Sequence, residues 1–350
     1  MAKKATRNAF GAANRNRLID TYFAASPVPS ISAETAWKHV YRLLLWVDRT
    51  TGLAHCYESD KCQPGKPWYA RSLAFHDWLS REMGAQPNEL AQNLDWLFMR
   101  ATTDLAAEVV RRVARIEAAA AQQRAPYSDR AFPKPGEDGE LIAIVKEVLG
   151  GNLSSEVPEP AWQMLVQRIR QYLATENKRK NLVGEGFEDV LAHVLQRTLK
   201  SGTADVRTRP ILQDLPGFAR TRQGDKPNKV DVAVLRPGAR TLVTAKWSVR
   251  ADREKQFTTD FGDYVAAESA GQPFQYVFVT NEFDPARLMR ACDKLAVNAP
   301  MFSHVVHINT DALVATYGAA PEPTMQRVLQ HIANSRLISL QKWIGMLDGV

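Results

Sequence analysis

Two short apolar runs joined by a Pro-Gly pair constrain the fold of this chain more than any other feature. The runs are 229–235 (KVDVAVL) and 241–247 (TLVTAKW), and both are rich in residues that favour strands. Pro237-Gly238 is the pair favoured at the centre of a type II turn, so the two runs are predicted to form a β-hairpin. Such a hairpin can bring Asp231, near the start of one strand, to the same sheet edge as Lys246, near the end of the other.

The second half of the chain alternates between helical and strand patterns. Apolar spacing predicts further strands at 275–281 and 303–310, and helices at 140–149, 159–177, 184–200, 252–269, 284–296 and 323–345. This order indicates an α/β (α+β) fold with a mixed central sheet flanked by helices. The last stretch, 325–347, is amphipathic and could pack on its own subunit or on another.

The first part of the chain has a different character. Apolar residues at three- and four-residue spacing predict helices at 33–48, 66–84 and 88–124. Residues 125–139 hold three prolines and two glycines, which is typical of a linker. We therefore expect two domains: a helical N-terminal domain, 1–135, for DNA contact or assembly, and a catalytic domain, 136–350.

Charge and composition narrow the class of protein. The 350 residues carry a net charge of +7, of which 1–135 contribute +6 (19 basic minus 13 acidic residues), so a polyanionic partner is favoured. No apolar run approaches the ~20 residues of a membrane span, and no signal peptide is visible at the start. The three cysteines form no even framework, which favours a reducing cytoplasm.

Asp231 and Lys246 together suit one kind of chemistry. An acidic ligand can hold a hard cation such as Mg²⁺, which activates water and stabilises the charge that develops on a phosphate. A neighbouring lysine can orient or help to deprotonate the attacking water. The hairpin therefore predicts a metal-dependent phosphodiesterase, although a single carboxylate would hold Mg²⁺ poorly.

The hairpin resembles the active site of the PD-(D/E)xK nucleases, with two departures: Val230 replaces the Pro and Thr244 replaces the second acid. Residues 246–253 (KWSVRADR) then resemble the K-(W/R)-(S/T)-(I/L)-R-S-D-R signature of type II restriction endonucleases that cut sites with a CCGG core. In that family a small residue occupies the vacated acid position. The acid is supplied from the following helix, fourteen residues after the Lys, where this chain has Asp260.

The resemblance also implies the remaining active-site residues. The family carries a Glu on an earlier helix, and residues 184–188 (GEGFE) fit that context, with Glu188 as the choice and Glu185 as the alternative. Either could instead have a capping or surface role. The implied Mg²⁺ ligands are therefore Asp231, Asp260 and Glu188, with Lys246 at the attacking water.

Arg250, Asp252 and Arg253 suit the reading of bases. An Arg can donate twice to guanine O6 and N7, and an Asp can accept from cytosine N4. Reading a palindromic CCGG site would require two copies of these three residues, in a homodimer or a larger homo-oligomer. The resemblance further implies cleavage before the first C, which leaves a 5′ overhang.

Three alternatives stay open. The first is a solvated ion-pair cluster at residues 250–253 instead of a base-reading one. The second is a nuclease of the same fold that acts on junctions, in repair or on modified DNA. The third, indicated by the missing acid at Thr244, is a DNA-binding protein that has lost catalysis.

Overall fold

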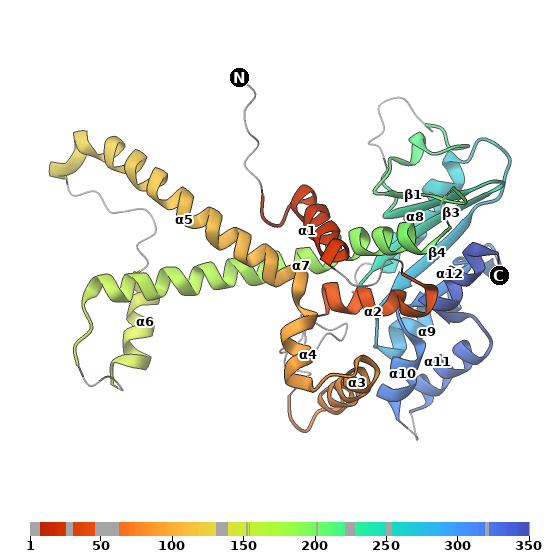
Figure 1. Ribbon diagram of the computed structural model, residues 1–350, viewed down its shortest axis with the longest axis horizontal. Helices are drawn as coiled ribbons and strands as arrows, with labels where there is room; N and C mark the ends of the chain where they lie inside the picture. The colour runs from red at the N-terminus through yellow and green to blue at the C-terminus, as the bar shows by residue number, and fades with distance from the viewer. Residues whose placement is uncertain are drawn as a thin grey trace.

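The fold contains a six-stranded mixed β-sheet with helices packed on both faces, seen at the right-hand side of Figure 1, from which α5 (Trp96–Arg124) and α7 (Glu159–Thr198) extend to the left. The structure, a computed structural model, describes residues 8–25, 31–45, 63–130, 139–151, 153, 155–200, 202–220, 228–249, 254–318 and 322–349. The strands, in their order across the sheet, are β1 Asp205–Thr208, β2 Val232–Arg236, β3 Ala239–Lys246, β4 Gln275–Thr280, β7 His304–His307 and β8 Leu337–Ser339. Outside this sheet, β5 Leu295–Ala296 pairs with β6 Ala299–Pro300. The predicted α/β fold with a mixed central sheet is confirmed.

The hairpin expected from the sequence is the β2–β3 pair. Its strands are antiparallel, with Val232 opposite Val243. Gly238 has φ 71°, the left-handed conformation that the turn requires and that glycine adopts without steric cost. β3, β4, β7 and β8 then run parallel to one another, whereas β1 is antiparallel to β2. The start of β2 and the end of β3 therefore lie at one edge of the sheet, as predicted.

Helices account for most of the remaining described residues. They are α1 Ala12–Ala25, α2 Ala33–Leu44, α3 Pro67–Met83, α4 Pro87–Leu94, α5 Trp96–Arg124, η2 Ala125–Arg130, α6 Gly139–Gly150, α7 Glu159–Thr198, η3 Leu212–Asp214, α8 Glu254–Ala267, α9 Pro285–Asp293, α10 Thr310–Tyr317, α11 Pro323–Ala333 and α12 Leu340–Asp348. The helical character predicted for the N-terminal part is confirmed by α2 to α5. Helices α1 and α10 and strand β1 were not predicted.

One long helix, α7, replaces the two helices that the sequence predicts at 159–177 and 184–200. It has 40 residues and passes through Gly184 and Gly186 without a break. A glycine inside a helix costs only about 1 kcal/mol relative to alanine, which tertiary packing can offset. At Gly186 an added Cβ would lie 3.5 Å from side-chain atoms of Leu182 and Leu44, an ordinary van der Waals distance, so α7 packs beside Leu44 of α2 at this point.

The helix predicted at 323–345 is also different in the structure. It is divided into α11 and α12 by strand β8, which pairs in parallel with β7 and extends the sheet. The chain turns at Ser335, which has φ 57°, and Leu337 and Ile338 are then buried in the sheet. The apolar spacing of this stretch therefore belongs to three short elements instead of one helix.

The edge of the sheet where β2 begins and β3 ends, which we call the hairpin edge, lies between helices on opposite faces of the sheet. On one face, α8 packs through Phe257 and Tyr264, whose rings lie 5.1 Å from Phe278 and 5.4 Å from Tyr276 of β4. On the other face, α7 packs through Phe187 on Trp247, which follows β3, with ring centroids 5.4 Å apart. Each of the two helices can therefore present a side chain to the edge where β2 begins and β3 ends.

The buried apolar residues of the N-terminal helices and of the sheet form one continuous cluster, from Ala9 to Leu347. A second, separate cluster joins α6 to α7 (Ile142, Val145, Trp162 and Val166). The division into domains at residue 135 stays a prediction. Among the described helices, none combines the length and the apolar character that a bilayer crossing requires.

We predict that Phe187→Ala lowers the free energy of unfolding by about 3–5 kcal/mol, because it opens a cavity between α7 and the sheet. Urea denaturation measures the change. Leu73→Ala on α3, where the side chain is 54% exposed, is the control and should change stability by no more than about 0.5 kcal/mol. Equal losses in the two variants would contradict the packing described for α7.

Candidate active site

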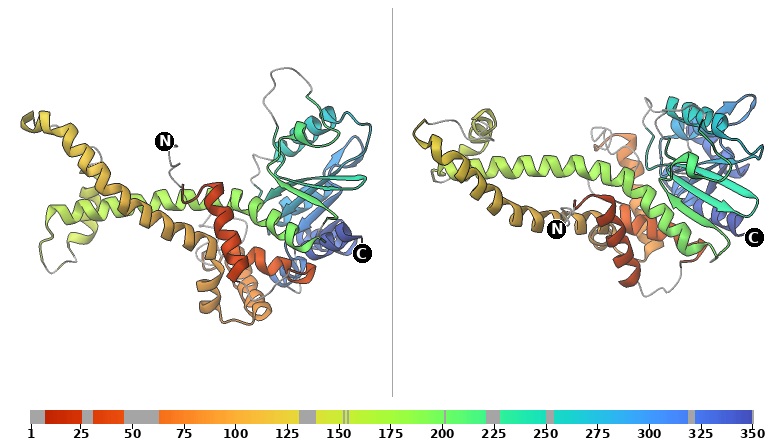
Figure 2. Two further views of the ribbon diagram at one scale, coloured as in Figure 1. Left: turned by 45° about the horizontal axis from the view of Figure 1, so that its top comes forward. Right: turned by 90° about the horizontal axis from the view of Figure 1, so that it is seen from above.

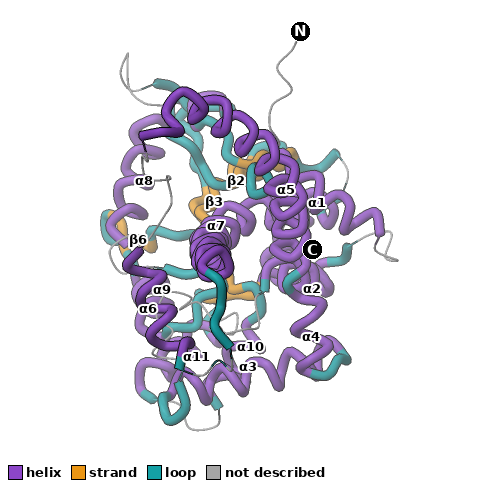
Figure 3. The backbone as a smooth tube through the Cα atoms, turned by 90° about the vertical axis from the view of Figure 1, so that its left-hand side faces the viewer, coloured by secondary structure: helices purple, strands orange, loops and turns teal. Residues whose placement is uncertain are grey.

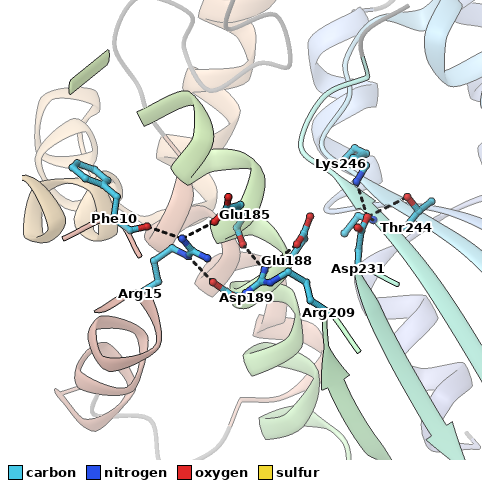
Figure 4. Close-up of polar contacts among 10 residues, drawn as sticks. Phe10, Arg15, Glu185, Glu188, Asp189, Arg209, Asp231, Thr244 and Lys246 are labelled. Atoms are coloured by element: carbon cyan, nitrogen blue, oxygen red, sulfur yellow. Dashed lines mark hydrogen bonds and ion pairs between the residues drawn. The ribbon is translucent and has the colours of Figure 1, made fainter. Parts of the chain in front are cut away.

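The site is centred on the carboxylate of Asp231, at the hairpin edge (Figure 4). Asp231 directly precedes β2, and Lys246 is the last residue of β3. Because the two strands are antiparallel, the two residues meet, and Lys246 Nζ donates to Asp231 Oδ2 at 2.7 Å. The pair that the sequence places at one sheet edge is therefore an ion pair in the structure.

Two more donors from β3 point to the same oxygen. The hydroxyl of Thr244 donates to Asp231 Oδ2 at 3.2 Å, and the backbone N–H of Ala245 donates to it at 2.9 Å. Thr244 is buried, so its hydroxyl is fixed. The position where a second acid was missing thus holds a hydrogen-bond donor that orients the carboxylate of Asp231.

Glu188 approaches Asp231 from α7. Its side chain is 12% exposed, and burial together with the negative charge of Asp231 raises its pKa to about 7, although Arg209 and Lys246 lower it in part. Glu185, the alternative, is 60% exposed and pairs with Arg15 at 2.8 Å. Of the two candidate acids, Glu188 is the one that faces Asp231 and Lys246.

Asp260 approaches from α8, on the other face of the sheet. Burial, followed by the negative charge of Asp231, raises its pKa to about 6, whereas Lys246 lowers it. The electrostatic influence of Asp231 and Lys246 on Asp260 indicates that α8 brings this acid to the same edge. The structure therefore joins Asp231 to Lys246 by a direct contact, and the charges of both residues act on Glu188 and on Asp260.

The donor set fits a hard divalent cation by its chemistry. Among the described residues, no three His, Cys, Asp or Glu side chains converge tightly enough to form a ready-made metal cage. However, burial and then the charge of Asp231 raise the pKa of both Glu188 and Asp260, although Lys246 lowers both and Arg209 lowers that of Glu188. A cation relieves this repulsion, and carboxylate oxygens are the ligands that Mg²⁺ prefers.

Arg209 is the residue of this site that the sequence analysis missed. It follows β1, has φ 47°, and donates from its backbone N–H to the carbonyl oxygen of Asp231 at 2.9 Å. Its guanidinium donates to Glu188 at 2.9 Å and also to Asp189. Asp189 is buried and is bound on its other oxygen by Arg15 of α1, at 2.6 Å. The network therefore joins α1, α7 and the residue after β1 to the acid cluster.

No local motif predicts this network. Arg209 lies far from Glu188 and Asp231 in the sequence, and nothing near it resembles a catalytic signature. The available signal was the pair Glu188-Asp189, since two adjacent acids near a buried helix segment need cationic partners.

The predicted base-reading residues, Arg250, Asp252 and Arg253, lie outside the described residues. The described chain before them ends at Val249, whose backbone N–H donates to Glu282 Oε2 at 2.8 Å. The described chain after them resumes at Glu254, where α8 begins. Their role as base readers stays a prediction.

Comparison with known proteins identifies no family for this chain. No protein-family model matches the chain, and no curated protein matches it in sequence. The interpretation of the site therefore depends on its own residues and on their geometry.

We predict that Arg209→Ala lowers the free energy of unfolding by about 3 kcal/mol, because it removes one of the two cations that surround the buried Asp189. Arg207→Ala is the matched control. Arg207 pairs with Asp205 at 2.8 Å on the surface, and such pairs contribute no more than about 1 kcal/mol. Chemical denaturation of both variants measures the difference. A loss at Arg209 no larger than that at Arg207 would show that the network adds nothing to stability.

The raised pKa values predict a pH dependence of stability in the absence of divalent ions. Glu188 and Asp260 bind protons more tightly in the folded state than in the unfolded state. The stability that this tighter proton binding contributes is complete below the ordinary pKa of each group. It is lost as the pH rises through about 6 for Asp260 and about 7 for Glu188. Glu188→Gln should therefore lose less stability than the wild type between about pH 5 and about pH 8. Denaturation curves across this range test it, and parallel pH profiles would contradict the raised pKa of Glu188.

Proposed function

We propose that this chain is a type II restriction endonuclease with a PD-(D/E)xK-like catalytic core, which hydrolyses duplex DNA at a palindromic site containing CCGG in the presence of Mg²⁺. The observation that carries the proposal is the 2.7 Å contact between Lys246 and Asp231 at the edge of a mixed sheet, with Glu188 and Asp260 electrostatically linked to it. The mixed sheet with helices on both faces is consistent with that core.

Asp231, Glu188 and Asp260 are the residues that would hold Mg²⁺. A bound Mg²⁺ supplies Lewis acidity, which stabilises the charge that develops on the scissile phosphate and lowers the pKa of a bound water. The three donors on Asp231 Oδ2 fix the orientation of this carboxylate before any substrate arrives. Arg209 does the same for Glu188 from the opposite side, with a hydrogen bond of 2.9 Å.

Lys246 is the residue that would act on the attacking water. Its ammonium group lies beside the carboxylate that orients it and is partly exposed, so it can also donate to a water or to a phosphate oxygen. Thr244 supports this arrangement, because a hydroxyl at that position leaves the acid function to Asp260. In this proposal the site would be the relocated-acid form of the PD-(D/E)xK motif, with Asp where that form has Glu.

The proposed specificity for CCGG rests on the amino-acid sequence. Arg250 and Arg253 would donate to guanines and Asp252 would accept from a cytosine, each pair contributing about 1–3 kcal/mol of discrimination. Two copies related by a two-fold axis would read both halves of CCGG and cut before the first C on each strand. The net charge of +7 favours the association with DNA.

We predict that Lys246→Ala slows the cleavage of a CCGG-containing duplex by at least about 100-fold with Mg²⁺, while specific binding to that duplex is retained. Lys255→Ala is the matched control, since Lys255 is an exposed lysine on α8, and this variant should cut at the wild-type rate. Single-turnover cleavage and gel-shift titrations measure the two properties.

Two outcomes would overturn the assignment. If Lys246→Ala cleaved the duplex at the wild-type rate, this site would not be the one that hydrolyses DNA. Specific binding by the wild type without cleavage, in either Mg²⁺ or Mn²⁺, would instead favour the DNA-binding protein that has lost catalysis.

A further inference from the structure

Arg209 is tied to the candidate site through both its backbone and its side chain. The second half of α7, which carries Glu188, lies against the sheet, whereas the first half extends away from it (Figure 2). In the view along α7, α1 lies on one side of this helix and α8 on the other (Figure 3). Arg209, directly after β1, donates from its backbone to Asp231 and from its side chain to Glu188. It therefore contacts two of the three acids between which a divalent cation would be held.

The backbone of Arg209 has a conformation that arginine rarely adopts. Its φ of 47° is in the left-handed region, which is sterically unfavourable for a residue with a Cβ atom. The other described non-glycine residues with positive φ are Val297, Asn298 and Ser335, which belong to turns beside short strands. Strained residues are concentrated at binding and catalytic sites, where the surrounding structure holds them in place. The strain at Arg209 thus points to a function beyond packing.

The buried carboxylate of Asp189 has two guanidinium partners, which differ in their access to solvent. Arg15 binds Oδ2 at 2.6 Å, and its side chain is only 2% exposed. Arg209 binds Oδ1, and its side chain is 27% exposed. Arg209 is therefore the cation of this network that a ligand at the site can reach from solvent.

The guanidinium of Arg209 also has hydrogen-bond donors to spare. A guanidinium carries five N–H donors. Within the described part of the chain, those of Arg209 bind three acceptors, which are Glu188 Oε2, Asp189 Oδ1 and the carbonyl oxygen of Glu185. Two donors, one of them on Nε, are thus left for a ligand. Phosphate oxygens are acceptors that arginine binds well, because the interaction is charge-assisted and the guanidinium is planar.

We propose that Arg209 binds the scissile phosphate of the DNA substrate, by donating to a non-bridging oxygen, and stabilises the charge that develops there during hydrolysis. The inference rests on the proposed function, which supplies the phosphodiester. Lys246 binds Asp231 and Arg209 binds Glu188, so the two cations lie at different acids of the cluster (Figure 4). Lys246 would act on the attacking water and Arg209 on the phosphate. Arg209 keeps its proton throughout, and its effect is electrostatic.

The test measures whether the charge of Arg209 and the charge of one phosphate act together in binding. Binding is titrated in EDTA, so that no cleavage interferes, to a CCGG duplex and to the same duplex with a neutral methylphosphonate at one position, scanned across the site. Neutralising the phosphate before the first C should weaken binding by the wild type at least about 10-fold more than binding by Arg209→Gln. Repulsion between that phosphate and the acids is present in both proteins and cancels in this comparison.

Two further variants complete the design. Arg207→Gln is the matched control, because Arg207 pairs with Asp205 on the surface, and it should respond to each methylphosphonate as the wild type does. Arg209→Lys keeps a cation beside Asp189 and decides the question if circular dichroism shows that Arg209→Gln is unfolded. Its response to the neutral phosphate should be at least about threefold smaller than that of the wild type, because an ammonium group lacks the planar fork.

Equal responses of the wild type and the folded Arg209 variants at every position would overturn the inference and leave Arg209 as a support of Glu188 alone. A difference confined to another phosphate would overturn it as well. A difference at the expected phosphate in a protein that does not cleave with Mg²⁺ would reject the nuclease and keep the phosphate contact.

The salt dependence of binding separates the remaining outcomes. If the wild type binds duplex DNA without preference for CCGG, the proposed specificity is rejected. Arg209→Gln should then still lower the slope of log K against log salt concentration by about 0.9, whereas Arg207→Gln should leave it unchanged. An unchanged slope in Arg209→Gln would overturn the phosphate contact, and a wild type that binds no duplex at all would reject both proposals.

Discussion

The hydrogen bonds that converge on one oxygen of Asp231 set the geometry on which the rest of the site depends. Lys246, Thr244 and Ala245 all donate to Oδ2, and all three belong to the strand that pairs with the strand after Asp231. Burial, followed by the negative charge of Asp231, raises the pKa values of Glu188 and Asp260, although Lys246 lowers both and Arg209 lowers that of Glu188. Two carboxylates whose charged forms are disfavoured in this way, beside the carboxylate of Asp231, are the physical basis for expecting a divalent cation there.

Around this centre, the N-terminal helices help to hold the residues of the candidate site in place. Arg15 of α1 binds the buried Asp189, whose other oxygen is bound by Arg209, and Arg209 orients Glu188. On the same side, the hydroxyl of Tyr41 on α2 donates to Asn281 at the end of β4, at 3.0 Å. The N-terminal segment is therefore a structural support of the site.

The sequence predicted the parts of this structure that local patterns encode. The hairpin, its turn and the meeting of Asp231 with Lys246 follow from strand alternation and a Pro-Gly pair, whereas Glu188 and Asp260 were implied only by the resemblance to a nuclease signature. Long-range effects were not predictable in this way: α7 continues through Gly184 and Gly186, where it packs against α2, and pairing with β7 places 337–339 in a strand. Arg209 was missed because its partners are distant in sequence, and α1 because Asn14 and Arg15 are polar residues buried by tertiary contacts.

The central claim is that this cluster of acids and one lysine hydrolyses DNA at a defined sequence. The most direct measurement is to incubate the wild-type protein with a plasmid containing CCGG sites in Mg²⁺, and to sequence the ends of the products by run-off from both strands. The account predicts breaks on both strands within CCGG-containing sites, before the first C, and no breaks without the metal. Intact plasmid under these conditions, or ends that bear no relation to CCGG, would contradict it.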